Sequence, residues 1–361
     1  MEGEIAKADE LTIQQATVDV PSNLCLNSLP VADVEVESQY VYRYVDFFGA
    51  GYLSGLRVAV YEHSSVARDL LRTILERLGA EVISLGRTND FVPIDTEAVR
   101  PEDVIQARKW AQEHAFDAIF STDGDADRPL IGDETGQWLR GDVVGILCAK
   151  FLAADVVVTP VNSNTLAEKS GWFSEVVRSR IGSPYVIAGM EQASAESTGV
   201  VVGFEANGGF LLGSDVARNG KRLLALPTRD AILPMLAVLV MTKEKRCKIS
   251  ELVAGLPSRY TASDRLQGFS SDESATLLKA LSQDQPKATQ VMAPKAGNFA
   301  SVDFKDGLRV TFSNGDIVHL RPSGNAPELR CYAESDTQDK AQFLCYQCLA
   351  RVYALSKAKS N

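Results

Sequence analysis

Three aspartates stand at alternate positions in the segment Asp123-Gly-Asp125-Ala-Asp127-Arg128. Carboxylates with this spacing on a tight loop can turn their oxygens toward one hard divalent cation, and without a cation their charges repel one another. The guanidinium of Arg128 could bind a phosphate beside the metal. Glu134 falls at the twelfth position counted from Asp123, as in a calcium-binding EF-hand, but an EF-hand needs glycine where Arg128 stands. We therefore predict a catalytic Mg²⁺ site, with an EF-hand and a solvated acidic turn as alternatives.

A second polar loop has the sequence Glu205-Ala-Asn207-Gly208-Gly. Its carboxylate and its amide can form hydrogen bonds with neighbouring hydroxyl groups of a sugar. Taken alone, the same residues also fit a turn that merely carries polar side chains. Sugar binding at this loop is therefore a hypothesis that depends on what the rest of the chain supplies.

The third loop contains the segment Arg321-Pro-Ser323-Gly324-Asn325 and ends at Arg330. Two guanidinium groups, a hydroxyl, an amide and a glycine that permits close approach of the backbone are the components of a phosphate-binding cradle. A plain loop between two strands is the alternative interpretation.

No evident nucleophile accompanies these loops. The chain has three histidines, and none of them stands in a serine–histidine–aspartate pattern. Ser64 and Ser65 follow an expected strand and precede an expected helix, so they are first of all candidates for a helix cap.

Hydrophobic periodicity predicts that strands and helices alternate up to residue 256. We expect strands at 56–61, 81–85, 117–120, 155–161, 175–178 and 200–203, and helices at 66–78, 101–114, 165–170, 184–194 and 229–243. Such alternation is typical of mostly parallel sheets with helices on both faces. A strand leads into each of the first two loops, and α/β folds bind ligands beyond the carboxyl ends of their strands. These two loops should therefore face one cleft.

From residue 257 onward strand-like runs dominate, at 307–312, 317–320 and 329–333, with an Asn314-Gly315 hairpin turn and a closing helix at 337–355. The predicted fold class is α/β, with two related, mostly parallel α/β domains followed by a C-terminal α+β domain. We expect an acidic linker at 1–40, a metal-loop domain at 41–142, a sugar-loop domain at 143–256 and a phosphate-loop domain at 257–361.

The composition excludes several functional classes. The 361 residues carry a net charge of −10, which disfavours a protein that binds the nucleic-acid backbone, with a local basic patch as the alternative. No secretory signal follows Met1, and the longest apolar run, at 231–241, is too short to span a membrane. Six scattered cysteines fit a reducing compartment, so we expect a cytoplasmic protein. The two cysteines of Cys345-Tyr-Gln-Cys348 are interpreted as thiols in the core or on the surface, and a redox or metal-binding role is the alternative.

The three loops, in this order, resemble those of the α-D-phosphohexomutase family, and in particular its bacterial phosphomannomutase/phosphoglucomutase group. The family's metal loop, D-G-D-x-D-R, matches in full. Its sugar loop, G-E-x-S-G, matches at Glu205 and Gly208 and departs at Phe204 and Asn207. Its phosphate loop, R-x-S-G-T-E-P with a following arginine, departs at Asn325 and Ala326 and matches at Arg321, Ser323, Gly324, Pro327 and Arg330. Arg180-Ile-Gly182 is similar to a further basic motif of the family, and the resemblance covers roughly residues 41–361.

The resemblance implies an enzyme that interconverts hexose 1-phosphates and 6-phosphates through a bisphosphate intermediate. Mg²⁺ would be held by the three aspartates of the metal loop, with Arg128 supporting the charge on the transferring phosphoryl group and a hexose 1,6-bisphosphate acting as activator. Glu205, Asn207 and Gly208 would hold the sugar, and the phosphate loop would hold the non-reacting phosphate, with Arg180 as an additional candidate. The expected ligand is mannose or glucose phosphate, and the oligomeric state is left open.

Family members carry a catalytic serine in a T-A-S-H-N-P-type loop of a first domain, and no serine of this sequence is followed by His-Asn-Pro. We therefore expect a fragment or a chain that is inactive alone, with residues 1–40 as the remnant of that domain. Two alternatives are a non-catalytic regulatory homologue that binds Mg²⁺ and a hexose phosphate, and an enzyme in which another serine, such as Ser64, accepts the phosphoryl group.

Overall fold

The computed structural model describes residues 33–324 and 326–358. The chain divides into two units after Gln39, and the second unit, from Tyr40 onward, holds the three sheets. Helix α2 (Val34–Phe48) begins inside the segment that we expected to be a linker, and residues 1–32 of that linker lie outside the described residues. The helix forms because apolar residues recur on one face, and these are the buried residues Val41, Tyr44, Phe47 and Phe48.

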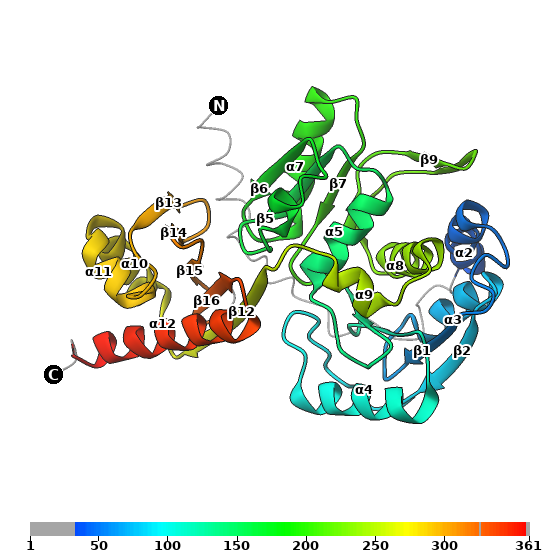
Figure 1. The fold of residues 1–361 in the computed structure, drawn as a ribbon, viewed down its shortest axis with the longest axis horizontal. Helices are drawn as coiled ribbons and strands as arrows, with labels where there is room; N and C mark the ends of the chain where they lie inside the picture. The colour runs from blue at the N-terminus through cyan, green and yellow to red at the C-terminus, as the bar shows by residue number, and fades with distance from the viewer. Residues whose placement is uncertain (1–32, 325, 359–361) are drawn as a thin grey trace, which may run out of the picture. The chain divides into compact units, whose positions relative to one another are not determined.

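The first sheet has the strand order β2-β1-β3-β4, and Figure 1 shows β1 and β2 side by side. The first three of these strands run parallel, and β4 is antiparallel to β3. Helices α3 and α4 connect the parallel strands, and α5 follows β4. The elements are β1 (Arg57–Tyr61), α3 (Arg68–Arg77), β2 (Glu81–Leu85), α4 (Pro101–His114), β3 (Ala118–Thr122), β4 (Pro129–Gly132) and α5 (Gly141–Phe151).

The second sheet repeats this plan with the order β11-β8-β7-β5-β6. Strands β5, β6 and β7 are parallel. At one edge, β8 pairs antiparallel with β7, and β11 pairs antiparallel with β8. Its elements are β5 (Val156–Pro160), α6 (Leu166–Lys169), β6 (Glu175–Ser179), α7 (Ser183–Glu196), β7 (Val201–Phe204), β8 (Phe210–Leu212) and β11 (Leu226–Asp230). A small hairpin of β9 (Val216–Arg218) and β10 (Lys221–Leu223) precedes β11, and α8 (Ile232–Lys245) and α9 (Ile249–Ala254) follow it.

Helix α8 begins later than the sequence predicts, because the segment before it is strand β11. Asp230 ends that strand, and its Oδ1 accepts a hydrogen bond of 2.9 Å from the backbone N–H of Ile232. The consequence is that Arg229, which we expected in the helix, lies on the strand. Residues 232–242 of α8 are all buried, and one continuous hydrophobic cluster joins the cores of the first two sheets.

The third sheet is antiparallel, with the order β12-β16-β15-β14-β13. Its elements are β12 (Tyr260–Gln267), α10 (Ser271–Gln283), α11 (Gln285–Met292), β13 (Phe299–Asp303), β14 (Leu308–Phe312), β15 (Ile317–Pro322), β16 (Glu328–Ser335) and α12 (Gln338–Ala358). The three helices and one face of the sheet form a second core. The predicted hairpin joins β14 to β15, with Gly315 at a φ of 84°.

These three sheets confirm the predicted fold class of two related, mostly parallel α/β units followed by an α+β unit. Within the described part of the chain, no helix combines the length and the apolar character needed to cross a membrane.

Candidate active site

The predicted metal loop, residues 123–128, connects β3 to β4. It lies at the carboxyl end of β3, which is a buried strand. Two hydrogen bonds between Asp123 and Arg128 close the loop. The backbone N–H of Asp123 donates to the Arg128 carbonyl at 3.2 Å, and the backbone N–H of Arg128 donates to Asp123 Oδ1 at 3.1 Å. Ala126 adopts a positive φ of 65° to complete the turn. This tight path brings carboxylate oxygens of Asp123, Asp125 and Asp127 within 4.8 Å of one another.

The chemistry of these carboxylates fits a divalent cation. Burial, together with the charges of Asp125 and Asp127, raises the pKa of Asp123 to about 6, and burial also raises the pKa of Asp127. Asp127 Oδ1 is buried and has no hydrogen-bond partner among the described residues. Arg128 Nε lies 3.5 Å from Asp123 and 3.6 Å from Asp127, too far for a strong charge-assisted hydrogen bond. A hard cation would supply the missing positive charge.

The arrangement does not support an EF-hand. A strand precedes the loop instead of a helix. Glu134, the residue at the twelfth position, binds the backbone N–H and the hydroxyl of Ser250, so its carboxylate is engaged away from the three aspartates.

The sugar loop connects β7 to β8 and is built as a tight turn. The backbone N–H of Gly208 donates to the Glu205 carbonyl at 3.0 Å, and the N–H of Gly209 donates to Asn207 Oδ1 at 3.0 Å. Gly208 has a φ of 92°, a conformation that favours glycine. Burial raises the pKa of Glu205, whose Oε2 lacks a hydrogen-bond partner within the described chain. The Asn207 oxygen is thus used within the loop, whereas Oε2 of Glu205 is left to a ligand or a counter-ion.

The metal loop and the sugar loop meet at Arg229. Its Nη2 lies 2.5 Å from Asp127 Oδ2, and its Nη1 lies 3.7 Å from Glu205 Oε2. The two loops therefore face the same space. The sequence did not single out Arg229, because the residue was expected only as the start of the helix at 229–243.

The phosphate loop connects β15 to β16. Ser323 is buried, and its backbone N–H donates to the Glu328 carbonyl at 2.8 Å. Gly324 has open space around its Cα, and Asn325 lies outside the described residues. Arg321 Nε lies 3.3 Å from Asp306 Oδ1, which sets the direction of that guanidinium group.

A row of three arginines crosses the third sheet next to this loop. Arg330 on β16 pairs with Arg321 on β15 and with Arg265 on β12, so the three side chains share one face. Glu328 is the acid nearest to two of them, 3.5 Å from Arg265 and 3.6 Å from Arg330. Like charges on neighbouring strands repel, so such a row is suited to a bound anion. Arg265 was not predicted, because it reaches this row only through strand pairing.

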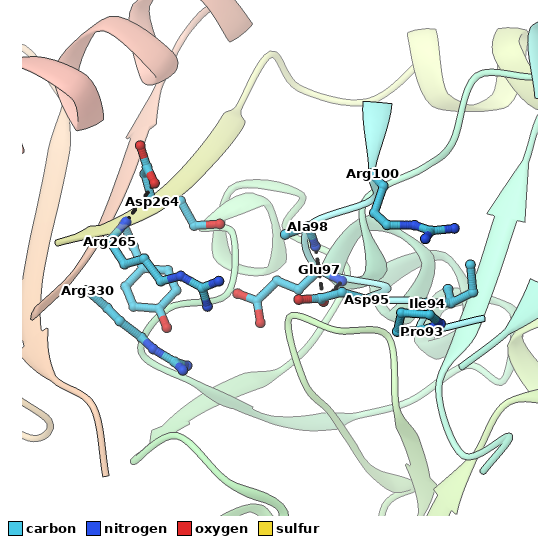
Figure 2. Close-up of a pocket in the computed structure, with 11 residues that line it drawn as sticks. Pro93, Ile94, Asp95, Glu97, Ala98, Arg100, Asp264, Arg265 and Arg330 are labelled. Atoms are coloured by element: carbon cyan, nitrogen blue, oxygen red, sulfur yellow. Dashed lines mark hydrogen bonds between the residues drawn. The ribbon is translucent and has the colours of Figure 1, made fainter. Parts of the chain in front are cut away.

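A cavity of about 490 Å³ separates two arginines of this row, Arg265 and Arg330, from the loop at residues 93–100. Figure 2 shows Glu97 pointing across the cavity toward the guanidinium groups of Arg265 and Arg330. Burial raises the pKa of Glu97, and the charges of Arg140 and Arg330 act in the opposite direction. The same loop contacts the sugar loop, since Thr96 Oγ1 donates to the Asn207 carbonyl at 2.7 Å. On one side of the cavity, the loop at 93–100 is thus bonded to the sugar loop. On the other side, Arg330 pairs across the strands with Arg321 of the phosphate loop.

The remaining candidates lie apart from this centre. Arg180 is exposed, with its guanidinium 4.7 Å from the centre of the Tyr185 ring. Its neighbour Ile181 donates its N–H to Asp306 Oδ2 at 2.9 Å, so Arg180 is connected with the carboxylate that orients Arg321. Ser64 Oγ accepts a hydrogen bond of 2.8 Å from the backbone of Val92, which is a structural role. Cys345 and Cys348 are buried, free thiols of α12.

The chain matches three protein-family models along most of its length. Residues 40–136 match "Phosphoglucomutase/phosphomannomutase, alpha/beta/alpha domain II", residues 140–260 match domain III of the same family, and residues 261–347 match its C-terminal domain.

Individual proteins agree with these matches. A phosphomannomutase of Salmonella muenchen is 48% identical over 343 residues, which cover 94% of this chain and 70% of that protein. A phosphoglucomutase/phosphomannomutase family protein of Burkholderia thailandensis has a similar structure, with a TM-score of 0.66, 20% identity, and coverage of 89% of this chain and 65% of that one. N-acetylphosphoglucosamine mutase of Aspergillus fumigatus, solved with GlcNAc-6P and magnesium, has a TM-score of 0.57 and 17% identity over 88% of this chain and 70% of that one. The chain thus spans about two thirds of the length of these proteins.

Proposed function

Because the chain belongs to the phosphoglucomutase/phosphomannomutase family of phosphotransferase isomerases, we propose that its three loops form the Mg²⁺- and hexose-phosphate-binding part of a phosphomannomutase-type active site. The observation that carries this proposal is the meeting of the metal loop with the sugar loop at Arg229. The loop at 93–100, which contacts the sugar loop through Thr96, faces Arg265 and Arg330 across a cavity. A charged sugar phosphate needs this combination of a cation site, hydroxyl acceptors and an anion site at separate points.

Each loop has a distinct role in the proposal. Asp123, Asp125 and Asp127 would hold Mg²⁺, which supplies positive charge next to the transferring phosphoryl group when it is bound. Glu205 accepts hydrogen bonds from sugar hydroxyls, because its buried carboxylate oxygen has no hydrogen-bond partner in the described chain. Arg321, Ser323 and Arg330 grip the phosphate that does not react. This positioning is the contribution that such a site makes to the rate.

Mannose phosphate is the ligand that we favour, because the Salmonella relative carries the name phosphomannomutase. Hexose 1,6-bisphosphate, which has a phosphate at each end, is expected to bind as well. Nothing observed favours the non-catalytic alternative. We further propose the domain limits predicted from the sequence, and a cytoplasmic location that fits the free thiols of the described cysteines.

The direct test is binding, measured by calorimetry with mannose 6-phosphate, glucose 6-phosphate and MgCl₂. The wild-type chain should bind a hexose phosphate saturably. Asp125→Asn should weaken Mg²⁺ binding, and Arg330→Met should weaken hexose-phosphate binding about tenfold or more. Arg222→Met is the matched control, because this exposed arginine pairs with Asp215 outside the three loops. Absence of saturable hexose-phosphate binding would refute the proposal.

Phosphoryl acceptance is tested separately. Incubation with glucose 1,6-bisphosphate, followed by mass spectrometry, would place a phosphate on Ser64 if that serine were the acceptor. We expect Ser64 to stay unmodified, because its hydroxyl is engaged by the backbone of Val92.

A further inference from the structure

Arg229 connects the two loops that would bind the cation and the sugar. Its guanidinium contacts Asp127 Oδ2 through Nη2 at 2.5 Å and faces Glu205 Oε2 through Nη1 at 3.7 Å. The side chains of Asp127 and Arg229 are both about three-quarters buried, with 25% and 24% exposure, so water screens this pair only partly. The second oxygen of Asp127, Oδ1, is buried without a hydrogen-bond partner among the described residues. Asp127 therefore has one oxygen paired with Arg229 and one available for a cation.

The scaffold holds the backbone of Arg229 in place. The next residue, Asp230, is buried and accepts hydrogen bonds from the hydroxyls of Tyr40, at 2.7 Å, and of Tyr44. It also accepts a hydrogen bond from the N–H of Ile232 at the start of α8. This network fixes the end of β11, so the guanidinium of Arg229 leaves a rigid point of attachment.

The sugar loop is shaped to let this side chain pass. A Cβ added to Gly209 would lie 2.8 Å from Arg229 Cδ and 3.0 Å from its Cγ, distances shorter than ordinary van der Waals contact. Any larger residue at position 209 would therefore displace the arginine stem. The close fit is independent of the ion pairs, and it points to a defined position for Arg229 between the loops.

We propose that Arg229 is a positioning residue that couples cation binding to sugar binding, an inference that rests on the proposed function. In the cation-free site, Arg229 holds Asp127. A cation held at Asp127 Oδ1 would draw negative charge away from Oδ2, which would weaken the pair of Asp127 with Arg229 and strengthen the interaction of Arg229 with Glu205. Glu205 would then be held more firmly in position for the sugar. Coupling of this kind is reciprocal, so the hexose phosphate should in turn strengthen cation binding.

The coupling predicts effects of opposite sign in one variant. Arg229→Met removes a positive charge that competes for Asp127, so Mn²⁺, used as a probe for Mg²⁺, should bind about threefold to tenfold more tightly. The same variant leaves Glu205 without its counter-ion, so mannose 6-phosphate should bind about tenfold more weakly. A purely structural role would weaken both ligands together.

The experiment is calorimetry of the whole chain with MnCl₂ and with mannose 6-phosphate, each alone and in the presence of the other. Bound Mn²⁺ is checked independently by electron paramagnetic resonance. Wild-type protein should show mutual strengthening, Arg229→Met should lose it, and Arg229→Lys, which keeps the charge, should retain part of it. The control Arg222→Met should behave as wild type.

The outcomes separate the two hypotheses. Weaker binding of both ligands by Arg229→Met, or no change in either, overturns the coupling while the proposed function stands. An equal response of Arg222→Met also overturns it, because the effect would then be one of general charge. If Asp127→Asn keeps wild-type affinity for Mn²⁺, or if the wild-type chain binds neither ligand, the proposed function fails and the coupling fails with it.

Discussion

His319 should remain uncharged in the folded protein between pH 8 and pH 5. Its ring is buried in β15 on the same face as Arg321, Nε2 donates to the backbone carbonyl of Asp306, and the ring stacks on Tyr332 with centroids 5.5 Å apart. Burial lowers the pKa of His319 to about 4, and the charges of Arg309 and Arg321 act in the same direction, whereas Asp306 acts against them.

The lowered pKa has a calculable effect on stability. An unfolded histidine has a pKa of about 6.5, so the unfolded chain binds more protons than the folded chain between about pH 4 and pH 6.5. The folded state therefore loses stability as the pH falls through this window. The difference between the pKa of His319 in the folded chain and in the unfolded chain corresponds to about 3.4 kcal/mol of unfolding free energy. About 2.5 kcal/mol of this is lost between pH 7.5 and pH 4.5. Burial also lowers the pKa of His63, which adds a loss of the same sign, so His319 must be isolated with a variant.

Nuclear magnetic resonance can follow the titration directly, because the chain has only three histidines. His63→Gln, His114→Gln and His319→Gln assign the three ring signals. The signal missing in His319→Gln should not titrate in wild-type protein between pH 8 and pH 5. A midpoint near 6.5 for that signal would refute the burial argument.

Urea unfolding measures the energetic consequence. His319→Gln should lose about 2.5 kcal/mol less than wild type when the pH is lowered from 7.5 to 4.5. Equal losses in wild type and His319→Gln would show that the folded-state pKa is not displaced.

Three further predictions concern the third sheet. Glu334→Ala would leave the buried guanidinium of Arg259 without its partner at 2.5 Å, and should lower the free energy of unfolding in urea by about 3–5 kcal/mol; a loss below about 1 kcal/mol would contradict this. Gly307→Ala drives a Cβ into the backbone oxygen of Leu320 on β15, whereas Gly315→Ala, also at positive φ, meets nothing within 4 Å. The first variant should therefore be clearly less stable in urea than the second, and equal losses would argue against the steric cause. Arg265→Met should weaken mannose 6-phosphate binding, measured by calorimetry, about threefold to tenfold, with wild-type affinity as the contrary result.

The metal loop could be predicted from the sequence because its parts are neighbours in the chain. Three aspartates within five residues converge once the backbone turns, and the turn is closed by hydrogen bonds between Asp123 and Arg128 themselves. The alternation of strands and helices and the Asn314-Gly315 hairpin were equally local, and the structure has both. The start of α8 was predicted wrongly because Asp230 ends a strand there, which apolar periodicity does not register.

Residues brought together by packing were beyond the reach of the sequence. Arg265 joins Arg330 only through the pairing of β12 with β16. Asp306 orients Arg321 and also contacts the backbone of Ile181. No spacing rule connects such positions, because strand register and the approach of one sheet to another depend on the whole core.

By itself, the sequence determined which side chains each loop carries, and side-chain type together with a tight local turn predicted a cation site and a phosphate cradle. Only the tertiary structure decided which loops lie together. The continuous core beneath the first two sheets places Arg229 between Asp127 and Glu205, about 100 residues from the one and about 25 from the other along the chain. The physical reason is that hydrogen bonds within a turn are local, whereas burial of apolar surface is a property of the assembled fold.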